Sequence, residues 1–227
     1  MDNFTKENQY NELLNIANNN GLSSLGLMTN QVWHEDPRRL AIILSRYKFV
    51  SKMLSGRGSV VEIGCADAFG TRIVQQEVKN ISVLDFDPIF INDVKDRLDK
   101  NWPLNAMVHD ILDGPIPFAP YEAAYSLDVL EHINKKHEDI FLNNIVKSLN
   151  INGVLIIGTP SIYSQDYASK QSREGHINCK SSEELKYLLE KYFYNVFIFS
   201  MNDEVVHTGF YPMAHYYFAL CSGVKSE

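Results

Sequence analysis

The feature that most constrains the fold is a short apolar run that ends in an acidic residue and a glycine. Residues 58 to 64 are rich in the β-branched side chains that are typical of a buried strand. Small residues then recur at alternate positions of the following turn: Gly64, Ala66, Ala68 and Gly70. Because small side chains let a bulky ligand approach the backbone closely, this pattern predicts a nucleotide-cofactor loop between a strand and a helix.

A second apolar strand supports this prediction. Asp85 closes it about twenty residues after Gly64, which is the separation expected of a carboxylate that binds a ribose. A dinucleotide fold would instead have Gly-x-Gly-x-x-Gly, and Glu62 would disfavour an anionic pyrophosphate nearby. We therefore expect a cationic nucleotide cofactor and consider an NAD-dependent oxidoreductase the weaker hypothesis.

These features resemble the class I S-adenosylmethionine-dependent methyltransferases, whose first motif is an acidic residue, any residue, and then Gly-x-Gly-x-Gly. Glu62 and Gly64 match this motif, while Ala66 and Ala68 replace its second and third glycines. We expect both alanines to keep φ negative where glycine is free to be left-handed, and this would change the shape of the loop.

The resemblance extends from about residue 59 to residue 220. Residues 81 to 88 resemble the second motif, which implies a ribose-binding Asp85, and residues 109 to 111 resemble the third, which implies an adenine contact. Residues 125 to 133 resemble the fourth strand and the turn after it. Together, the resemblance assigns these residues to S-adenosylmethionine: Glu62, Gly64, Ala66, Gly70, Asp85, Phe86, Asp110, Ile111 and Leu127.

The order of elements predicts an α/β fold. Strands are expected at 58–64, 80–86, 104–109, 122–128, 153–159, 194–201 and 213–221, and helices at 4–20, 36–55, 70–78, 88–100, 135–149 and 181–192. This alternation predicts a parallel sheet with helices on both faces. The resemblance implies a Rossmann-like, seven-stranded, mostly parallel sheet with an antiparallel last strand.

The same pattern predicts how the chain is organised. The first two helices would form an N-terminal helical cap over residues 1–57, before an S-adenosylmethionine-binding domain over residues 58–227. Residues 161–180 are polar and lack periodicity, so we expect an irregular loop with a functional role.

Composition excludes several classes of protein. With 227 residues, 45% of them hydrophobic, the chain can bury a substantial core, and its net charge of −7 without a basic run disfavours nucleic acid as a partner. No apolar run reaches membrane-spanning length and no secretion signal is present, so we expect a cytoplasmic protein without membrane insertion. The sequence leaves the oligomeric state open.

Two histidines are candidates for a catalytic base. His132 follows the predicted fourth strand, and His176 lies in the predicted loop. An imidazole titrates near neutral pH, so either could remove a proton from an acceptor, although each could equally be a packed or solvated residue.

A metal is a further hypothesis. Asp128, Glu131, His132 and His176 are similar to the metal-binding Glu-x-x-Glu-His and distal His of the ubiquinone-biosynthesis and small-RNA 2′-O-methyltransferases. Aspartate replaces the first glutamate, and the same run is common in metal-independent relatives, so no metal is assigned.

We expect an S-adenosylmethionine-dependent enzyme that methylates an oxygen, less readily a nitrogen, of a small polar, sugar-like or anionic acceptor. The residues predicted to line the acceptor site are Trp33, Arg38, Arg39, Tyr163 and Arg173. A non-catalytic cofactor-binding scaffold subunit and a metal-assisted O-methyltransferase remain the alternatives.

Overall fold

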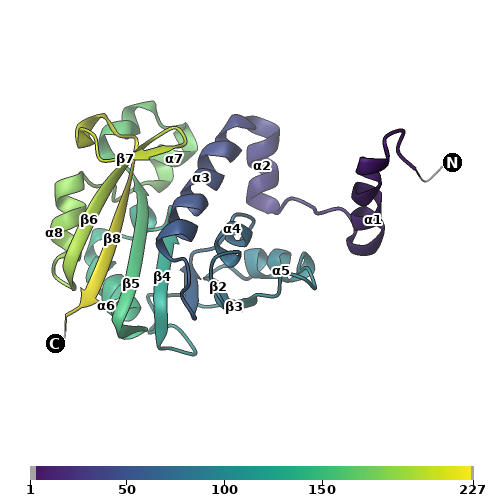
Figure 1. Ribbon diagram of the computed structural model, residues 1–227. Helices are drawn as coiled ribbons and strands as arrows, with labels where there is room; N and C mark the ends of the chain where they lie inside the picture. Colours follow the sequence, from purple (N-terminus) through teal and green to yellow (C-terminus); the bar gives the residue numbers. More distant parts are fainter. Residues whose placement is uncertain (1–3, 226–227) are drawn as a thin grey trace.

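Two hydrophobic cores lie on the two faces of a single sheet. Along one central strand, Ala123 and Tyr125 pack in one core and Ala124 in the other, because side chains of a strand alternate between faces. The computed structural model describes residues 4–225 and has helices on both sides of the sheet, as Figure 1 shows. This confirms the predicted α/β, Rossmann-like fold.

The sheet has the strand order β3-β2-β1-β4-β5-β8-β6-β7. Strands β1 to β5 are parallel to one another, β8 is antiparallel to both β5 and β6, and β7 is antiparallel to β6. The strands are β1 (Val60–Ile63), β2 (Ile81–Asp85), β3 (Asn105–Val108), β4 (Tyr121–Leu127), β5 (Leu149–Pro160), β6 (Phe193–Asn202), β7 (Val205–His207) and β8 (Tyr216–Val224). The last strand, β8, thus runs antiparallel to the first five and lies inside the sheet.

The sheet has eight strands in place of the predicted seven. The additional strand, β7, pairs with β6 through a two-residue turn in which Asp203 has a φ of 48°. A strand of three residues is too short to show the alternation on which sequence-based prediction depends.

The helices are more numerous than predicted. The α-helices are α1 (Asn11–Asn20), α2 (Leu27–Glu35), α3 (Arg38–Met53), α4 (Thr71–Gln75), α5 (Pro88–Asp96), α6 (Glu138–Lys147), α7 (Lys170–Gly175) and α8 (Ser182–Leu189). Short 3₁₀ segments are η1 (Asn8–Tyr10), η2 (Leu130–His132), η3 (Lys135–His137), η4 (Ile162–Tyr167) and η5 (Tyr211–Met213). Several predicted helices are therefore shorter than expected, with 3₁₀ turns at their ends.

Helix α2 was not predicted, because its start is stabilised by side chains distant in the sequence. The Thr29 amide donates to the Asp67 carboxylate at 2.6 Å, and the Leu27 amide donates more weakly to Asp93 at 3.4 Å. Such carboxylates satisfy the free amides of a helix start, as a local N-cap would. The first turn of α2 is thereby tied to the cofactor loop.

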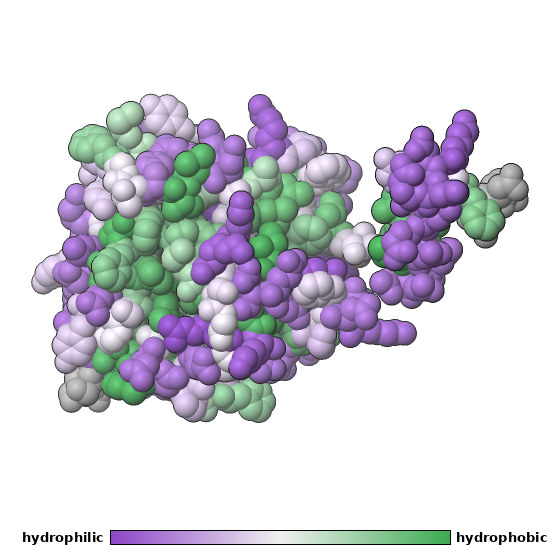
Figure 2. All heavy atoms as spheres, viewed as in Figure 1, coloured by the Kyte–Doolittle hydropathy of each residue, from purple (hydrophilic) through white to green (hydrophobic). Residues whose placement is uncertain are grey.

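The N-terminal helices differ in how they contact the rest of the chain. α3 contributes Val50 and Leu54 to a core of the sheet, whereas α1 has no buried residue and projects away from it (Figure 1). Figure 2 shows α1 as a separate, largely hydrophilic mass. Residues 1–3 and 226–227 lie outside the described residues, and the division into 1–57 and 58–227 stays a prediction.

The segment 161–180 is not the irregular loop that we predicted. It contains η4 and α7, whose first turns are capped by serine side chains. Ser161 accepts from the Tyr163 amide and Ser169 from the Ser172 amide. Serines favour caps, so their abundance is compatible with short helical turns.

Within residues 4–225, none of the helices has both the length and the hydropathy needed to cross a membrane.

Candidate active site

The cofactor loop between β1 and α4 is left-handed at three positions. Gly64, Ala66 and Ala68 have φ of 72°, 45° and 50°, so the expectation that the alanines keep φ negative is wrong. The Ala66 amide donates to Asp85 at 2.9 Å, and the Ala68 amide donates to the Cys65 carbonyl at 2.8 Å. These bonds help to hold a conformation that costs an alanine roughly 1 kcal/mol or more.

At Gly64, in contrast, a side chain would not fit. A Cβ atom there would lie 2.3 Å from the Cγ2 atom of Val129, in addition to the strain of a positive φ. The turn after β1 thus requires glycine where it passes the turn after β4.

Asp85 lies at the carboxyl end of β2 and organises the loop. Its carboxylate accepts from the amides of Ala66 and Asp87, both at 2.9 Å. Burial raises its pKa, and these two amides oppose that shift. A carboxylate has lone pairs beyond these two bonds, so the predicted ribose role is compatible with this position.

Glu62 is buried in the interior and does not face the edge of the sheet. Its carboxylate accepts from the hydroxyls of Tyr47 at 2.9 Å and Tyr125 at 2.7 Å, and from the hydroxyl of Thr71. Burial raises the pKa of Glu62 to about 7. These bonds join α3, α4 and β4 to β1, so any role of Glu62 in cofactor binding would act through the shape of the loop.

The other residues assigned to the cofactor lie near the carboxyl ends of β1 to β4. The Phe86 side chain is 70% exposed and is therefore accessible to a ligand, whereas Ile111 and Leu127 are buried. Asp110 is half-buried and accepts from the Leu112 amide at 2.8 Å. Gly70 precedes α4 and packs against Tyr47. Their direct contact with the cofactor stays a prediction.

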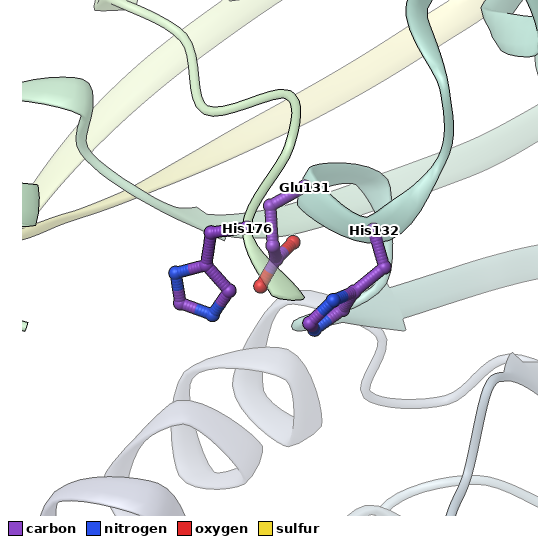
Figure 3. Close-up of side chains that lie close together, drawn as sticks. All are labelled: Glu131, His132 and His176. Atoms are coloured by element: carbon purple, nitrogen blue, oxygen red, sulfur yellow. The ribbon is translucent and has the colours of Figure 1, made fainter. Parts of the chain in front are cut away.

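Three side chains from distant parts of the chain converge beyond β4. Glu131 and His132 belong to η2, and His176 follows α7 (Figure 3). The carboxylate oxygen and ring nitrogens that they can offer lie within 4.8 Å of one another. The two imidazole rings are 5.1 Å apart at 69°. The structure therefore brings both predicted histidines to one place.

Hydrogen bonds determine the tautomer of each histidine. His132 Nδ1 lies 2.9 Å from the Gly175 carbonyl, and His176 Nδ1 lies 2.9 Å from Gln165 Oε1. The Gln165 amide nitrogen donates to the Ser161 carbonyl, which orients its oxygen toward His176. Both partners are acceptors, so Nδ1 carries the hydrogen and Nε2 keeps a free lone pair in each ring.

Glu131 is fully buried and only partly satisfied. Its Oε2 accepts from the Thr159 hydroxyl at 3.2 Å, whereas its Oε1 has no hydrogen-bond partner among the described residues. Burial, and then the nearby Asp128 carboxylate, raises the pKa of Glu131 to about 8. Burial also lowers the pKa of His176, with a smaller effect from His132. An unpartnered buried carboxylate oxygen is costly to a folded protein, and beside two imidazoles it is compatible with a site that binds a ligand or an ion.

A buried polar network holds His176 near η2. Lys180 pairs with Glu138, and Asn178 donates to Glu138 at 2.6 Å and to the Ile133 carbonyl at 2.9 Å. The Asn178 amide also donates to the Glu131 carbonyl at 3.0 Å. This network could not be predicted from the sequence, because Asn178 and Lys180 lie about forty residues after Glu138 and form no local pattern with it.

Asp128 does not join the cluster. Its φ is 56°, and its carboxylate pairs with Arg46 of α3 at 2.5 Å. The Arg46 guanidinium also lies 3.8 Å above the ring of Tyr216. Neither Arg46 nor Tyr216 was predicted as a site residue. The sequence does contain a signal for Arg46, because this charged residue lies four positions from both Ile42 and Val50, on the apolar face of the helix.

The predicted acceptor-binding residues are all exposed: Trp33, Arg38, Arg39, Tyr163 and Arg173. Arg38 has 89% of its side chain exposed and pairs with its neighbour Asp36. Within residues 4–225, no hydrogen bond or ion pair joins any two of these five side chains, and an acceptor wall made of them stays a prediction.

Comparisons with known proteins identify the family. A methyltransferase-domain family model matches residues 32–196. No curated protein matches the sequence. Among solved structures, the methyltransferase domain of bacterial CtHen1-C superposes with a TM-score of 0.65 at 16% identity, over 80% of this chain and 98% of that one.

Two further structures contain S-adenosylhomocysteine. The N-methyltransferase NodS from Bradyrhizobium japonicum WM9 has a TM-score of 0.60 at 20% identity, over 84% of this chain and 90% of that one. The DhpI complex has a TM-score of 0.60 at 15% identity, over 85% and 87%. At these identities the structures show the shared fold, while the family model covers most of the chain. The chain belongs to the methyltransferase-domain family and is an S-adenosylmethionine-dependent methyltransferase.

Proposed function

We propose that this enzyme transfers a methyl group to an oxygen, less readily a nitrogen, of a small polar acceptor, and that the acceptor atom reacts beside Glu131, His132 and His176. The observation that carries the proposal is the convergence of these three side chains within 4.8 Å, with one carboxylate oxygen unpartnered. They lie just beyond the carboxyl end of β4, where open α/β sheets bind their ligands.

The chemistry would be an in-line displacement at the sulfonium methyl. The acceptor oxygen forms a bond to the methyl carbon, the carbon–sulfur bond breaks, and the electron pair stays on sulfur as S-adenosylhomocysteine. The acceptor proton passes to a free Nε2 of His132 or His176, and the Glu131 carboxylate can stabilise the resulting imidazolium. Since the donor is already activated, alignment and water exclusion contribute most of the acceleration.

Replacement of the histidines tests the base. His132→Ala or His176→Ala should lower kcat by ~10²-fold or more and leave S-adenosylhomocysteine affinity nearly unchanged. Calorimetry and turnover would be measured on the acceptor identified by mass spectrometry of co-purifying molecules. Wild-type turnover in both variants would exclude a histidine base.

We infer that α2, α3 and the segment 161–180 select the acceptor. Asp67 connects α2 to the cofactor loop, and Asp128 connects α3 to the end of β4. Gln165, in the segment 161–180, contacts His176 directly. Deleting residues 1–35 should spare S-adenosylhomocysteine binding but abolish methyl transfer. Normal turnover by the truncated enzyme would place acceptor selection elsewhere.

A metal-assisted O-methyltransferase is a second candidate, favoured by the same three side chains. Two imidazoles and one carboxylate suit ions such as Zn²⁺, Mn²⁺ or Co²⁺. In both rings Nδ1–H donates to a carbonyl oxygen, which leaves Nε2 free for an ion, as is common in metal-bound histidines. The unpartnered Glu131 oxygen fits this donor set. When bound, such an ion would hold acceptor oxygens and increase their acidity. A chelator should abolish turnover under this candidate and leave it unchanged under the histidine-base mechanism.

A further inference from the structure

The Asp-x-x-Glu-His run places one more carboxylate near the cluster, yet that carboxylate pairs with Arg46 and is not one of the grouped ligand atoms. Among the described residues, the group of potential ligand atoms within 4.8 Å consists of Glu131, His132 and His176, without Asp128. Asp128 comes directly after β4, three residues before Glu131, so its absence from the group needs a physical cause.

Two contacts keep the Asp128 side chain away. Its left-handed backbone, with φ of 56°, changes the direction of the chain at the end of β4, where its amide donates to the Gly158 carbonyl at 3.0 Å. Its carboxylate then forms an ion pair with Arg46 at 2.5 Å. Since an ionised carboxylate is held most strongly by a charge-assisted bond of this kind, Arg46 competes with any cation for Asp128.

Arg46 is itself held firmly. Only 17% of its side chain is exposed, its guanidinium lies 3.8 Å above the Tyr216 ring, and its Nε atom is buried without a partner. Stacking and burial leave the guanidinium few other positions. Because Arg46 belongs to α3, a helix of the predicted cap determines which carboxylates face the cluster.

We propose that Arg46 holds Asp128 out of a divalent-cation site, so that the wild-type enzyme binds the cation through Glu131, His132 and His176 alone. Three protein ligands leave positions open for acceptor oxygens, as in other catalytic metal sites. This inference rests on the metal-assisted candidate proposed above.

Cobalt(II) titration of the full-length protein tests the inference without an acceptor. Arg46→Gln removes the positive charge and releases Asp128, so calorimetry should show cobalt affinity about tenfold higher or more. The visible absorption of bound cobalt should also change, because an additional oxygen ligand alters the coordination. The double variant Arg46→Gln/Asp128→Asn removes both charges and should return within about threefold of wild type.

Arg72 offers a matched control. It belongs to α4, pairs with Asp99 at 3.4 Å and lies 5.3 Å from the centre of the Trp102 ring. Neither partner belongs to the cluster, so Arg72→Gln should leave cobalt affinity unchanged. Unchanged affinity in Arg46→Gln would overturn the inference. A tenfold loss of cobalt affinity in the double variant would overturn it as well, because that loss would show that Asp128 already binds the cation. The double-variant measurement remains usable if the single variant Arg46→Gln does not fold.

Cobalt binding distinguishes the metal-assisted candidate from the proposed role of Arg46. If neither the wild type nor Arg46→Gln binds cobalt, the metal-assisted candidate fails, and this inference with it. If the wild type binds cobalt but Arg46→Gln does not change the affinity, this inference alone fails.

Discussion

Glu62 and Glu131 are both buried almost completely, and their surroundings are opposite. Glu62, at the start of the loop after β1, accepts hydrogen bonds from three hydroxyls on three different elements. Glu131, in η2 after β4, accepts a single side-chain bond from Thr159, and its other oxygen has no partner within residues 4–225. Burial raises the pKa of both carboxyls, to about 7 and about 8.

The difference separates a structural carboxyl from one kept free for a ligand. A satisfied buried group contributes to the uniqueness of the fold, whereas an unsatisfied one costs free energy that only a ligand, ion or substrate can recover. We therefore expect Glu62 to matter for stability and the loop, and Glu131 to matter for turnover.

The largest expected effect is on turnover. Glu131→Gln should lower kcat by ~10²- to 10⁴-fold, because both candidate mechanisms need an anionic oxygen beside the histidines. Its free energy of unfolding should stay within ~1 kcal/mol of wild type, since a desolvated carboxyl is removed. Glu62→Gln is the control and should keep kcat within several-fold. Equal kcat losses in the two variants would contradict the comparison.

The next effect is on stability as a function of pH. The unfolded chain ionises Glu62 near pH 4.5, but the folded protein keeps it protonated to about pH 7. The folded state therefore binds more protons between these values, and its free energy of unfolding falls by about 3 kcal/mol as pH rises through that window. The raised pKa of Glu131 adds a fall of its own over the same range. Urea unfolding should therefore show a total fall that is smaller by about 3 kcal/mol in Glu62→Gln than in wild type. The same pH dependence in both proteins would show that Glu62 is not its source.

A moderate effect is expected on cofactor affinity. Asp85→Ala should weaken S-adenosylhomocysteine binding by ~1.5 to 3 kcal/mol in calorimetry, because a charged acceptor of the ribose hydroxyls is lost. Asp87→Ala is the matched control, since Asp87 caps α5 by accepting from the Ile89 amide at 2.9 Å. It should cost about 1 kcal/mol of stability and little affinity. Unchanged affinity in Asp85→Ala would remove Asp85 from the site.

The smallest effect concerns the left-handed alanines. Ala66→Gly relieves a strained φ but increases the conformational freedom of the unfolded chain, so the free energy of unfolding should change by less than about 1 kcal/mol. Ala124→Gly, in the buried strand β4, also increases the freedom of the unfolded chain but relieves no backbone strain. It should therefore destabilise the protein by about 1 kcal/mol or more. Thermal unfolding distinguishes the two, and equal losses would indicate that Ala66 is not strained.

Local patterns predicted the arrangement of the loop after β1 and the end of β2 well. Gly64 and Asp85 end successive parallel strands, and parallel strands bring such ends to one edge of a sheet, so spacing alone placed them together. Helix α2 and strand β7 could not be predicted in the same way. The first depends on distant carboxylates at its start, and the second is only three residues long.

The cluster beyond β4 was predictable only in part. Glu131, His132 and His176 were recognisable together as potential metal ligands, but the histidine tautomers and the missing partner of one Glu131 oxygen do not follow from local sequence. The contact of Arg46 with the end of β4 was not predicted, because a sequence shows the type of a side chain and not the face on which it packs.

The sequence by itself determined the α/β fold and the family of the enzyme, because periodicity and loop composition are local properties. Tertiary structure decided which buried carboxyl is satisfied and which is not, and it paired Asp128 with Arg46 and left it out of the group of Glu131, His132 and His176. Those outcomes depend on hydrogen bonds and ion pairs between residues that lie tens of positions apart, and such pairings exist only once the chain has packed.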